Sequence, residues 1–174
     1  MKKTFILFVV IISQMIALGQ SNSKKDKIIA DSMTAKSEFI KADAKMSGLF
    51  GKAYGYAVFP NIGKAGIGIG GATGNGVAYE RGKMAGMARM TQLSIGFQWG
   101  GQAYREVIFF EAKKDMNRFK ENRIELSAQV SAVAVTAGAS ANAKYVDGVM
   151  VFTMQKGGLM YEASVGGQKL KFDK

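Results

Sequence analysis

The chain of 174 residues carries 24 Lys and Arg against 13 Asp and Glu, a formal charge of +11, and 48% of its residues are hydrophobic. This hydrophobic content supports a packed core and excludes the disordered class of proteins. Cysteine and histidine are absent, which excludes disulfides, thiolate metal sites and a catalytic imidazole. The charge favours anionic partners, but by itself it does not select lipid, nucleic acid or acidic glycans.

The first residues have the pattern of a secretory signal peptide. Two lysines precede an apolar run over residues 5–12, which residues 15–18 extend past Ser13-Gln14. Ala17-Leu18-Gly19 then places small residues at the two positions that signal peptidase reads. We therefore predict a signal peptide over residues 1–19, cleaved before Gln20, and an exported protein that is periplasmic or secreted, with peripheral attachment to a membrane as one option. An uncleaved anchor is the alternative, but the apolar run is short for a spanning helix of about 20 residues.

The mature chain is expected to begin with a flexible polar segment over residues 20–26. An amphipathic helix is predicted over residues 27–46, because apolar residues including Phe39 recur at the 3.6-residue period and lysines lie opposite them. Gly48 or Gly51 is expected to end this helix. The apolar stripe can either pack on a sheet or insert into lipid, and the sequence leaves both alternatives open.

From residue 54 onward the hydrophobic period changes to two, which is typical of β-strands. Pro60-Asn61 is expected to end the first strand, and Thr73-Gly74-Asn75-Gly76 is expected to form a turn. The charged segment 112–121 predicts a short helix. One or two strands are expected within 124–143, and further strands at 54–59, 65–72, 77–80, 91–99, 103–111, 149–155, 159–165 and 169–172.

These patterns predict an α+β, β-rich fold. We expect a curled or barrel-like antiparallel sheet, with an N-terminal amphipathic helix and a short helix near 112–121, because closely spaced strands and glycine turns are typical of such sheets.

Two motifs could indicate a cofactor or a metal. Gly66–Gly71 contains G-x-G-x-x-G, but the residues that follow cannot start a good helix, so we interpret it as a glycine-rich strand and not as a dinucleotide site. The thioethers of Met84, Met87 and Met90 would suit Cu(I), but methionine also fills irregular apolar gaps, and we favour packing. The sequence therefore predicts no cofactor and no metal.

The charged residues of the strands and of the short helix give no catalytic or nucleic-acid signature. Four carboxylates fall in or near strands without a spacing that pairs two of them, and they are interpreted as surface charge: Glu80, Glu106, Glu111 and Asp147. Basic residues within 113–123 alternate with acidic ones, as on a solvated helix. With the predicted export, this argues against a nucleic-acid partner, and we expect no enzymatic activity.

Three segments of the chain, in order, resemble the SYLF domain family. The first comprises Tyr56–Asn61 and the alternating glycines of Lys64–Val77. The second is the Gly-Phe-Gln-x-Gly-Gly pattern within Ser94–Gln102, and the third is the glycine-flanked segment Lys156–Gly167. The resemblance indicates that residues 27–174 form one SYLF-like domain.

This resemblance implies a β-rich domain with helices and no known enzymatic activity. Eukaryotic members of the family bind phosphoinositides, partly through a basic amphipathic N-terminal segment, and some associate with actin. The chain departs from the family at Gly138-Ala139-Ser140, which lacks a common Gly-Arg, and at Asp31 and Glu38, which dilute the basic face of the first helix. The phosphoinositide and actin roles are therefore not transferred, whereas lipid binding is retained as a hypothesis.

The leading hypothesis is non-catalytic binding of an anionic lipid or membrane surface in the cell envelope. Each basic residue near an anionic membrane contributes on the order of 1 kcal/mol, and Phe39 represents the stripe that would insert or pack. The alternative is a structural or adaptor protein of the envelope that binds another protein through its sheet. The basic residues expected to supply attraction are Lys24, Lys25, Lys27, Lys41 and Lys45.

Overall fold

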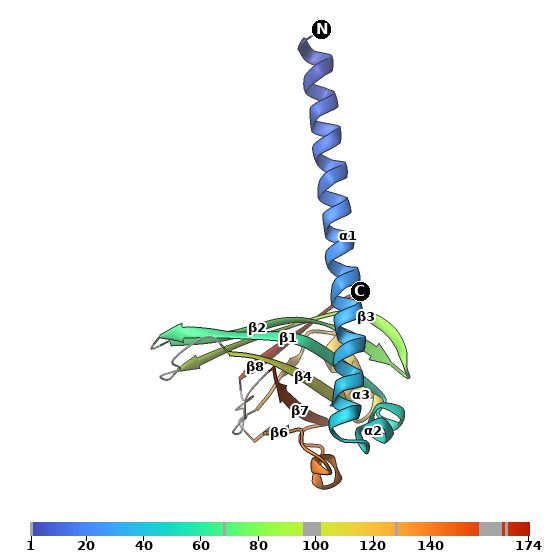
Figure 1. The fold of residues 1–174 in the computed structure, drawn as a ribbon, viewed down its shortest axis with the longest axis vertical. Helices are drawn as coiled ribbons and strands as arrows, with labels where there is room; N and C mark the ends of the chain where they lie inside the picture. The colour runs from blue at the N-terminus through green and yellow to red at the C-terminus, as the bar shows by residue number, and fades with distance from the viewer. Residues whose placement is uncertain (1, 68, 96–101, 128, 157–164, 166) are drawn as a thin grey trace.

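The computed structural model describes residues 2–67, 69–95, 102–127, 129–156, 165 and 167–174 (Figure 1). Within these residues, three helices and a 3₁₀ turn accompany eight strands. The helical elements are α1 (Lys2–Ala42), α2 (Met46–Lys52), α3 (Lys113–Lys120) and η1 (Ala139–Asn142). The strands are β1 (Gly55–Ile67), β2 (Ile69–Glu80), β3 (Lys83–Ile95), β4 (Gln102–Phe110), β5 (Ile124–Glu125), β6 (Ala132–Ala134), β7 (Val149–Gln155) and β8 (Gln168–Asp173).

The strands form one sheet in the order β5-β8-β3-β2-β1-β4-β7-β6, which curls into a half-barrel (Figure 1). The predicted α+β, β-rich class is therefore confirmed, as are the short helix near 112–121 and the strand over 149–155. One strand pair differs from the expected antiparallel arrangement, because β6 runs parallel to β7. The connection over residues 135–148 is long enough for the crossover that a parallel pair needs.

The N-terminal helix is longer than expected and ends earlier. Residues 20–26, expected to be flexible, are helical within α1, because no glycine or proline interrupts the chain between residues 20 and 42. α1 ends at Ala42, where the Asp43 carboxylate accepts a hydrogen bond from the Lys45 N–H at 3.1 Å and turns the chain. Gly48 and Gly51 do not end a helix; both lie inside α2.

The sequence suggested that Pro60 ends the first strand, but it does not. β1 continues to Ile67, and its register with β2 shifts between Val58 and Asn61, while that with β4 shifts between Phe59 and Ile62. A bulge leaves a residue outside the ladder, which suits proline because it has no N–H to donate.

The segment 73–76 is also strand and not turn. β2 runs through it, paired with β1 on one side and β3 on the other. Its glycines are needed for close packing: a Cβ on Gly74 would lie 2.7 Å from Ile62 Cγ1, and one on Gly76 would collide with the Val58 carbonyl oxygen. The actual turn is Arg81-Gly82, with φ of 49° and 76°, as two-residue hairpin turns require.

Alternation along the strands divides the apolar side chains between two cores. On the convex face, ten buried residues from α1, α2 and strands β1, β4 and β7 form one cluster, which we call the helix–sheet core. It comprises Ala35, Phe39, Met46, Phe50, Tyr56, Val58, Val107, Phe109, Met150 and Phe152.

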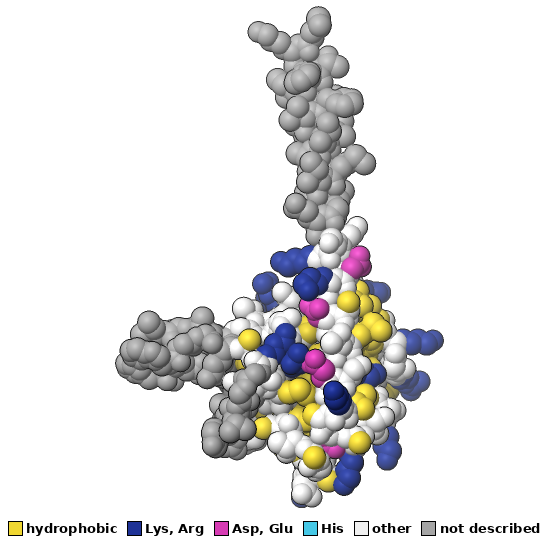
Figure 2. All heavy atoms as spheres, in the orientation of Figure 1, with side chains coloured by type: hydrophobic (Ala, Val, Ile, Leu, Met, Phe, Trp, Pro, Cys, Tyr) yellow, Lys and Arg dark blue, Asp and Glu magenta, His cyan; other side chains and the backbone are white. Residues whose placement is uncertain are grey.

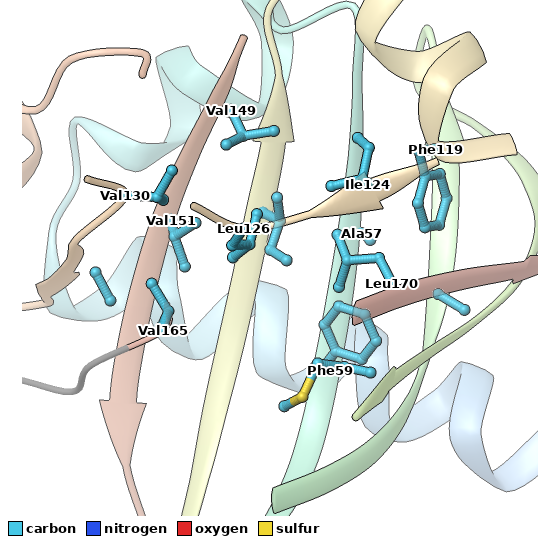
Figure 3. Close-up of a cluster of buried hydrophobic side chains, with 14 of the residues drawn as sticks. Ala57, Phe59, Phe119, Ile124, Leu126, Val130, Val149, Val151, Val165 and Leu170 are labelled. Carbon is cyan, nitrogen blue, oxygen red and sulfur yellow. The ribbon is translucent and has the colours of Figure 1, made fainter. Parts of the chain in front are cut away.

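The second core fills the concave side of the half-barrel. Figure 3 shows side chains from β1, β7 and β8 converging there with Phe119 of α3 and with Leu126 and Val130 of the following segment. Phe110 stacks on Phe119 with ring centroids 4.9 Å apart, which anchors α3 to the sheet. The two cores together fix α1 on one face of the sheet and α3 on the other.

Candidate functional site

α1 covers the convex face along only part of its length. Lys36 ties it to the sheet near its C-terminal end, donating to the Tyr56 hydroxyl at 3.0 Å and lying over the Phe50 ring at 4.9 Å. Toward its N-terminus the helix leaves the sheet (Figure 1), and an open groove of about 650 Å³ lies between it and strands β3 and β8.

Basic side chains dominate the polar lining of this groove. Lys24 and Lys25 come from α1, Arg89 from β3 and Lys171 from β8, against a single carboxylate, Asp173. Among the described residues, none of the four cations takes part in a hydrogen bond or an ion pair. Figure 2 shows Lys and Arg side chains gathered where the helix leaves the body of the molecule.

The strand register explains how the sheet contributes its two cations. Asn75, Arg89 and Lys171 are direct neighbours across β2, β3 and β8, and all three side chains are exposed, whereas the flanking Ala88 and Leu170 are buried. Two like charges placed directly opposite each other destabilise a sheet. An anion bound between them would relieve this repulsion, so the arrangement is suited to anion binding.

Apart from Asn75 and Asn122, the rest of the lining is apolar, and it continues into a second groove. Ile28 and Met87 lie among the cations in the first groove, and Phe172 borders it with its ring packed edge-on against Phe119 of α3. The second groove, of about 420 Å³, shares Lys25 and Met87 with the first and adds Ile29 and Met84. The combined surface therefore offers a cationic end and a second end, where the apolar side chains lie beside Asn22, Asp26 and Lys174.

The lysines that the sequence singled out do not form one patch. Lys24 and Lys25 line the groove, and Lys27 pairs with Asp31 at 3.3 Å. Lys41 is exposed at the other end of the helix, about 25 Å along its axis from Lys24 at 1.5 Å per residue, and Lys45 is exposed just after the helix ends.

Phe39 is fully buried in the helix–sheet core. Of the two alternatives left open for the apolar stripe, the structure shows packing on the sheet, and in this arrangement Phe39 does not face solvent.

Arg89 and Lys171 were missed by reasoning from the sequence, because 82 positions separate them and only the β3–β8 register brings them together. The available signal was local: each is a charged residue between buried apolar neighbours in a strand. That pattern marks an outward-facing position, but it does not indicate which other strand lies beside it.

One expected surface carboxylate is buried instead. Glu106 is 0% exposed on the concave side and accepts a hydrogen bond from Gln168 Nε2 at 3.0 Å. Burial, followed by the nearby Glu106 charge, raises the pKa of Tyr104 well above its usual value. Gln92 and Gln168 are also buried, which makes this cluster a polar part of the core that no described surface exposes to a substrate.

The two motifs that could have indicated a cofactor or a metal lie in strands, and the strand geometry does not form either site. Gly66 and Ile67 end β1, and Ile69–Gly71 begin β2, so the described residues of this motif lie in paired strands and precede no helix N-terminus that could hold a pyrophosphate. Met87 lines the groove on the convex face, whereas Met90 is buried in the concave core. Over the described residues, no cluster of three or more His, Cys, Asp or Glu could hold a metal ion, and no helix is long and apolar enough to span a membrane.

Comparison with known proteins gives two matches. Residues 91–174 match the family described as "Ysc84: Las17-binding protein actin regulator". The chain is 32% identical over 161 residues to "Beta cell expansion factor A" of Aeromonas veronii, covering 90% of this chain and 61% of that relative. The chain thus spans about three fifths of the relative's length. The resemblance to the SYLF (Ysc84) domain family that the glycine-rich segments indicated is therefore confirmed over residues 91–174.

Proposed function

We propose that this protein is exported and binds anionic membrane surfaces without catalysing a reaction. The observation that carries the proposal is the groove beside α1, where four cations face one carboxylate and none of the four is paired within the described part of the chain. Unpaired cations in a common lining attract anions, and each contributes on the order of 1 kcal/mol near an anionic bilayer. Because Phe39 is buried, the proposal assigns the affinity to charge attraction and not to insertion of this side chain.

Vesicle sedimentation tests the proposal. The protein should bind vesicles rich in phosphatidylglycerol and hardly bind neutral phosphatidylcholine vesicles. Binding should weaken as salt rises, because the Debye length falls from about 10 Å at 0.1 M to about 3 Å at 1 M.

Matched variants locate the binding surface. Exchanging Lys24 and Lys25 for Gln should weaken vesicle binding, because both line the groove. Exchanging Lys52 and Lys144, which are exposed outside both grooves, removes the same charge and should have a smaller effect. Salt-independent binding, or equal effects of the two pairs, would refute the electrostatic groove.

Export is tested separately by the intact mass of protein recovered from the native envelope. A mature species beginning at Gln20 would support it, whereas retention of residues 1–19 would overturn both the cleavage and the export that it implies.

An envelope adaptor that binds another protein is the second candidate. Its support is the family description, which names a Las17-binding actin regulator. Failure to bind either type of vesicle would favour this reading over the first. In that case the same two pairs of lysine variants would serve to map the protein-binding surface.

A further inference from the structure

We propose that the groove beside α1 binds one molecule of a single-chain anionic amphiphile, with its acidic headgroup on the cations and its hydrocarbon chain along the apolar extension. This inference rests on the proposed function and deepens it, because it assigns a stoichiometric site to what would otherwise be a diffuse surface attraction. Three features of the groove support it: the placement of the cations, the apolar lining beyond them, and the dimensions.

The cations surround the headgroup position from two sides. Arg89 and Lys171 are direct cross-strand neighbours, so their Cβ atoms are about 5 Å apart and one phosphate or carboxylate group can contact both. The arginine guanidinium can hold two oxygens of such a group at once. Lys24 and Lys25 face the same space from α1, so the charge comes from both walls of the groove.

The apolar lining begins among these cations. Ile28, Met87 and Phe172 lie in the first groove, and Ile29 and Met84 continue the lining in the second. Methionine adapts its shape to irregular apolar ligands. Met84 is 47% exposed, and it and Met33 are the exposed large hydrophobic side chains of the described residues.

Met33 follows Ile29 by four positions on α1, so the two share one face of the helix. The apolar surface therefore extends along the helix beyond the second groove. An inorganic anion would use only the cationic end, whereas an amphiphile would use both ends.

The dimensions are compatible with this occupant. The groove of about 650 Å³ falls within the roughly 300–1,000 Å³ of small-molecule sites, and a second groove of about 420 Å³ adjoins it. Because both grooves are open, a chain can enter from solvent without unfolding α1. Because the groove has both cations and apolar side chains, it fits a charged headgroup with an attached chain better than it fits a headgroup alone or a chain alone.

Isothermal titration calorimetry of the purified protein with dodecyl phosphate, below its critical micelle concentration, tests the inference. We expect saturable binding of one molecule per chain. Inorganic phosphate, which has only the headgroup chemistry, and dodecyl maltoside, which has the same chain on an uncharged headgroup, should each bind at least about tenfold more weakly. Binding of several molecules per chain, or equal binding of the maltoside, would overturn the proposal.

Variants separate the two ends of the site. R89Q with K171Q should weaken dodecyl phosphate binding about tenfold or more, because charge-assisted contacts are lost. M84Q should weaken dodecyl phosphate binding while leaving the weak binding of inorganic phosphate unchanged. Circular dichroism establishes that each variant is folded, and exchange of Lys52 and Lys144 for Gln is the matched control that should leave the stoichiometry and affinity nearly unchanged.

Vesicle binding distinguishes failure of this inference from failure of the proposed function. If vesicles bind through Lys24 and Lys25 but dodecyl phosphate shows no 1:1 binding, the amphiphile site is refuted and the surface function stands. If dodecyl phosphate binds 1:1 and anionic vesicles do not, the site is supported and membrane-surface binding is refuted.

Discussion

Replacement of Phe39 by alanine tests whether the helix–sheet core holds α1 on the sheet. Phe39 is 0% exposed and lies in a cluster with the buried aromatic side chains of α2 and of strands β1, β4 and β7. A phenylalanine buries about 150–250 Å², and at about 25 cal/mol per Å² this corresponds to about 4–6 kcal/mol as an upper value, since alanine retains part of the area. Measured losses for buried aromatics give about 3–5 kcal/mol, which is the loss that we expect in the free energy of unfolding.

The assay is urea unfolding followed by far-ultraviolet circular dichroism, with thermal unfolding as a second measure. For a domain of this size each kcal/mol lowers the melting temperature by about 2–4 °C, so Phe39→Ala should lower it by about 6–20 °C. Met33→Ala is the matched control, because this side chain lies on the same helix and is 62% exposed. Its effect should stay within about 0.5 kcal/mol.

A loss below about 1 kcal/mol for Phe39→Ala would refute the reasoning, because a fully buried aromatic cannot be removed at so little cost. It would mean that α1 does not rest on the sheet in solution. If this variant stays folded and still binds vesicles as the parent does, its role is packing alone.

Three further predictions concern the turn after α1, the glycine strand and the methionine run. The hydroxyl and N–H of Ser140 hold the pKa of Asp43 below its ordinary value. The stabilisation that the Asp43 carboxylate provides is therefore present above a pH of about 4 and is lost as the pH falls through the lowered pKa. In urea unfolding, Asp43→Asn should lower the free energy of unfolding by about 1.5–3 kcal/mol at pH 7 and by clearly less at pH 3. Gly76→Ala should cost about 1–3 kcal/mol through collision with strand β1, whereas Gly63→Ala, with nothing within 4 Å, should not show this loss; similar melting temperatures would contradict the packing role. Met84, Met87 and Met90 should bind no stoichiometric Cu(I) together, because Met84 and Met87 line the groove beside α1 whereas Met90 is buried on the other face of the sheet. Stoichiometric copper in elemental analysis that disappears when these three methionines are replaced would reverse this conclusion.

Local patterns in the sequence determined the fold class and several element bounds. The charged segment 112–121 gave α3, and the alternating segment 149–155 gave β7 with the same bounds. The expected strand over 169–172 lies within β8. Residues 96–99, and residues 159–164 of the strand expected over 159–165, lie outside the described residues. These predictions succeeded because each element has an apolar period that depends only on neighbours a few residues apart.

The errors at residues 60 and 73–76 have one physical cause. Proline and Asn-Gly are turn formers in isolation, but β1 and β2 are neighbours in the middle of the sheet and pair on both sides. Those ladders outweigh local turn preference, and the bulge in β1 accommodates the proline.

The candidate site shows the same division between local and long-range information. The sequence identified Lys24 and Lys25 by their local charge, and it identified Phe39 as part of an apolar stripe. It could not decide whether that stripe meets sheet or lipid, because an amphipathic helix has the same pattern in both cases. It also could not place Arg89 beside Lys171, since strand register is fixed by burial of alternate side chains across the whole sheet. Lys24, Lys25, Arg89 and Lys171 come together only in the tertiary structure. They line the groove in which α1 lies beside β3 and β8.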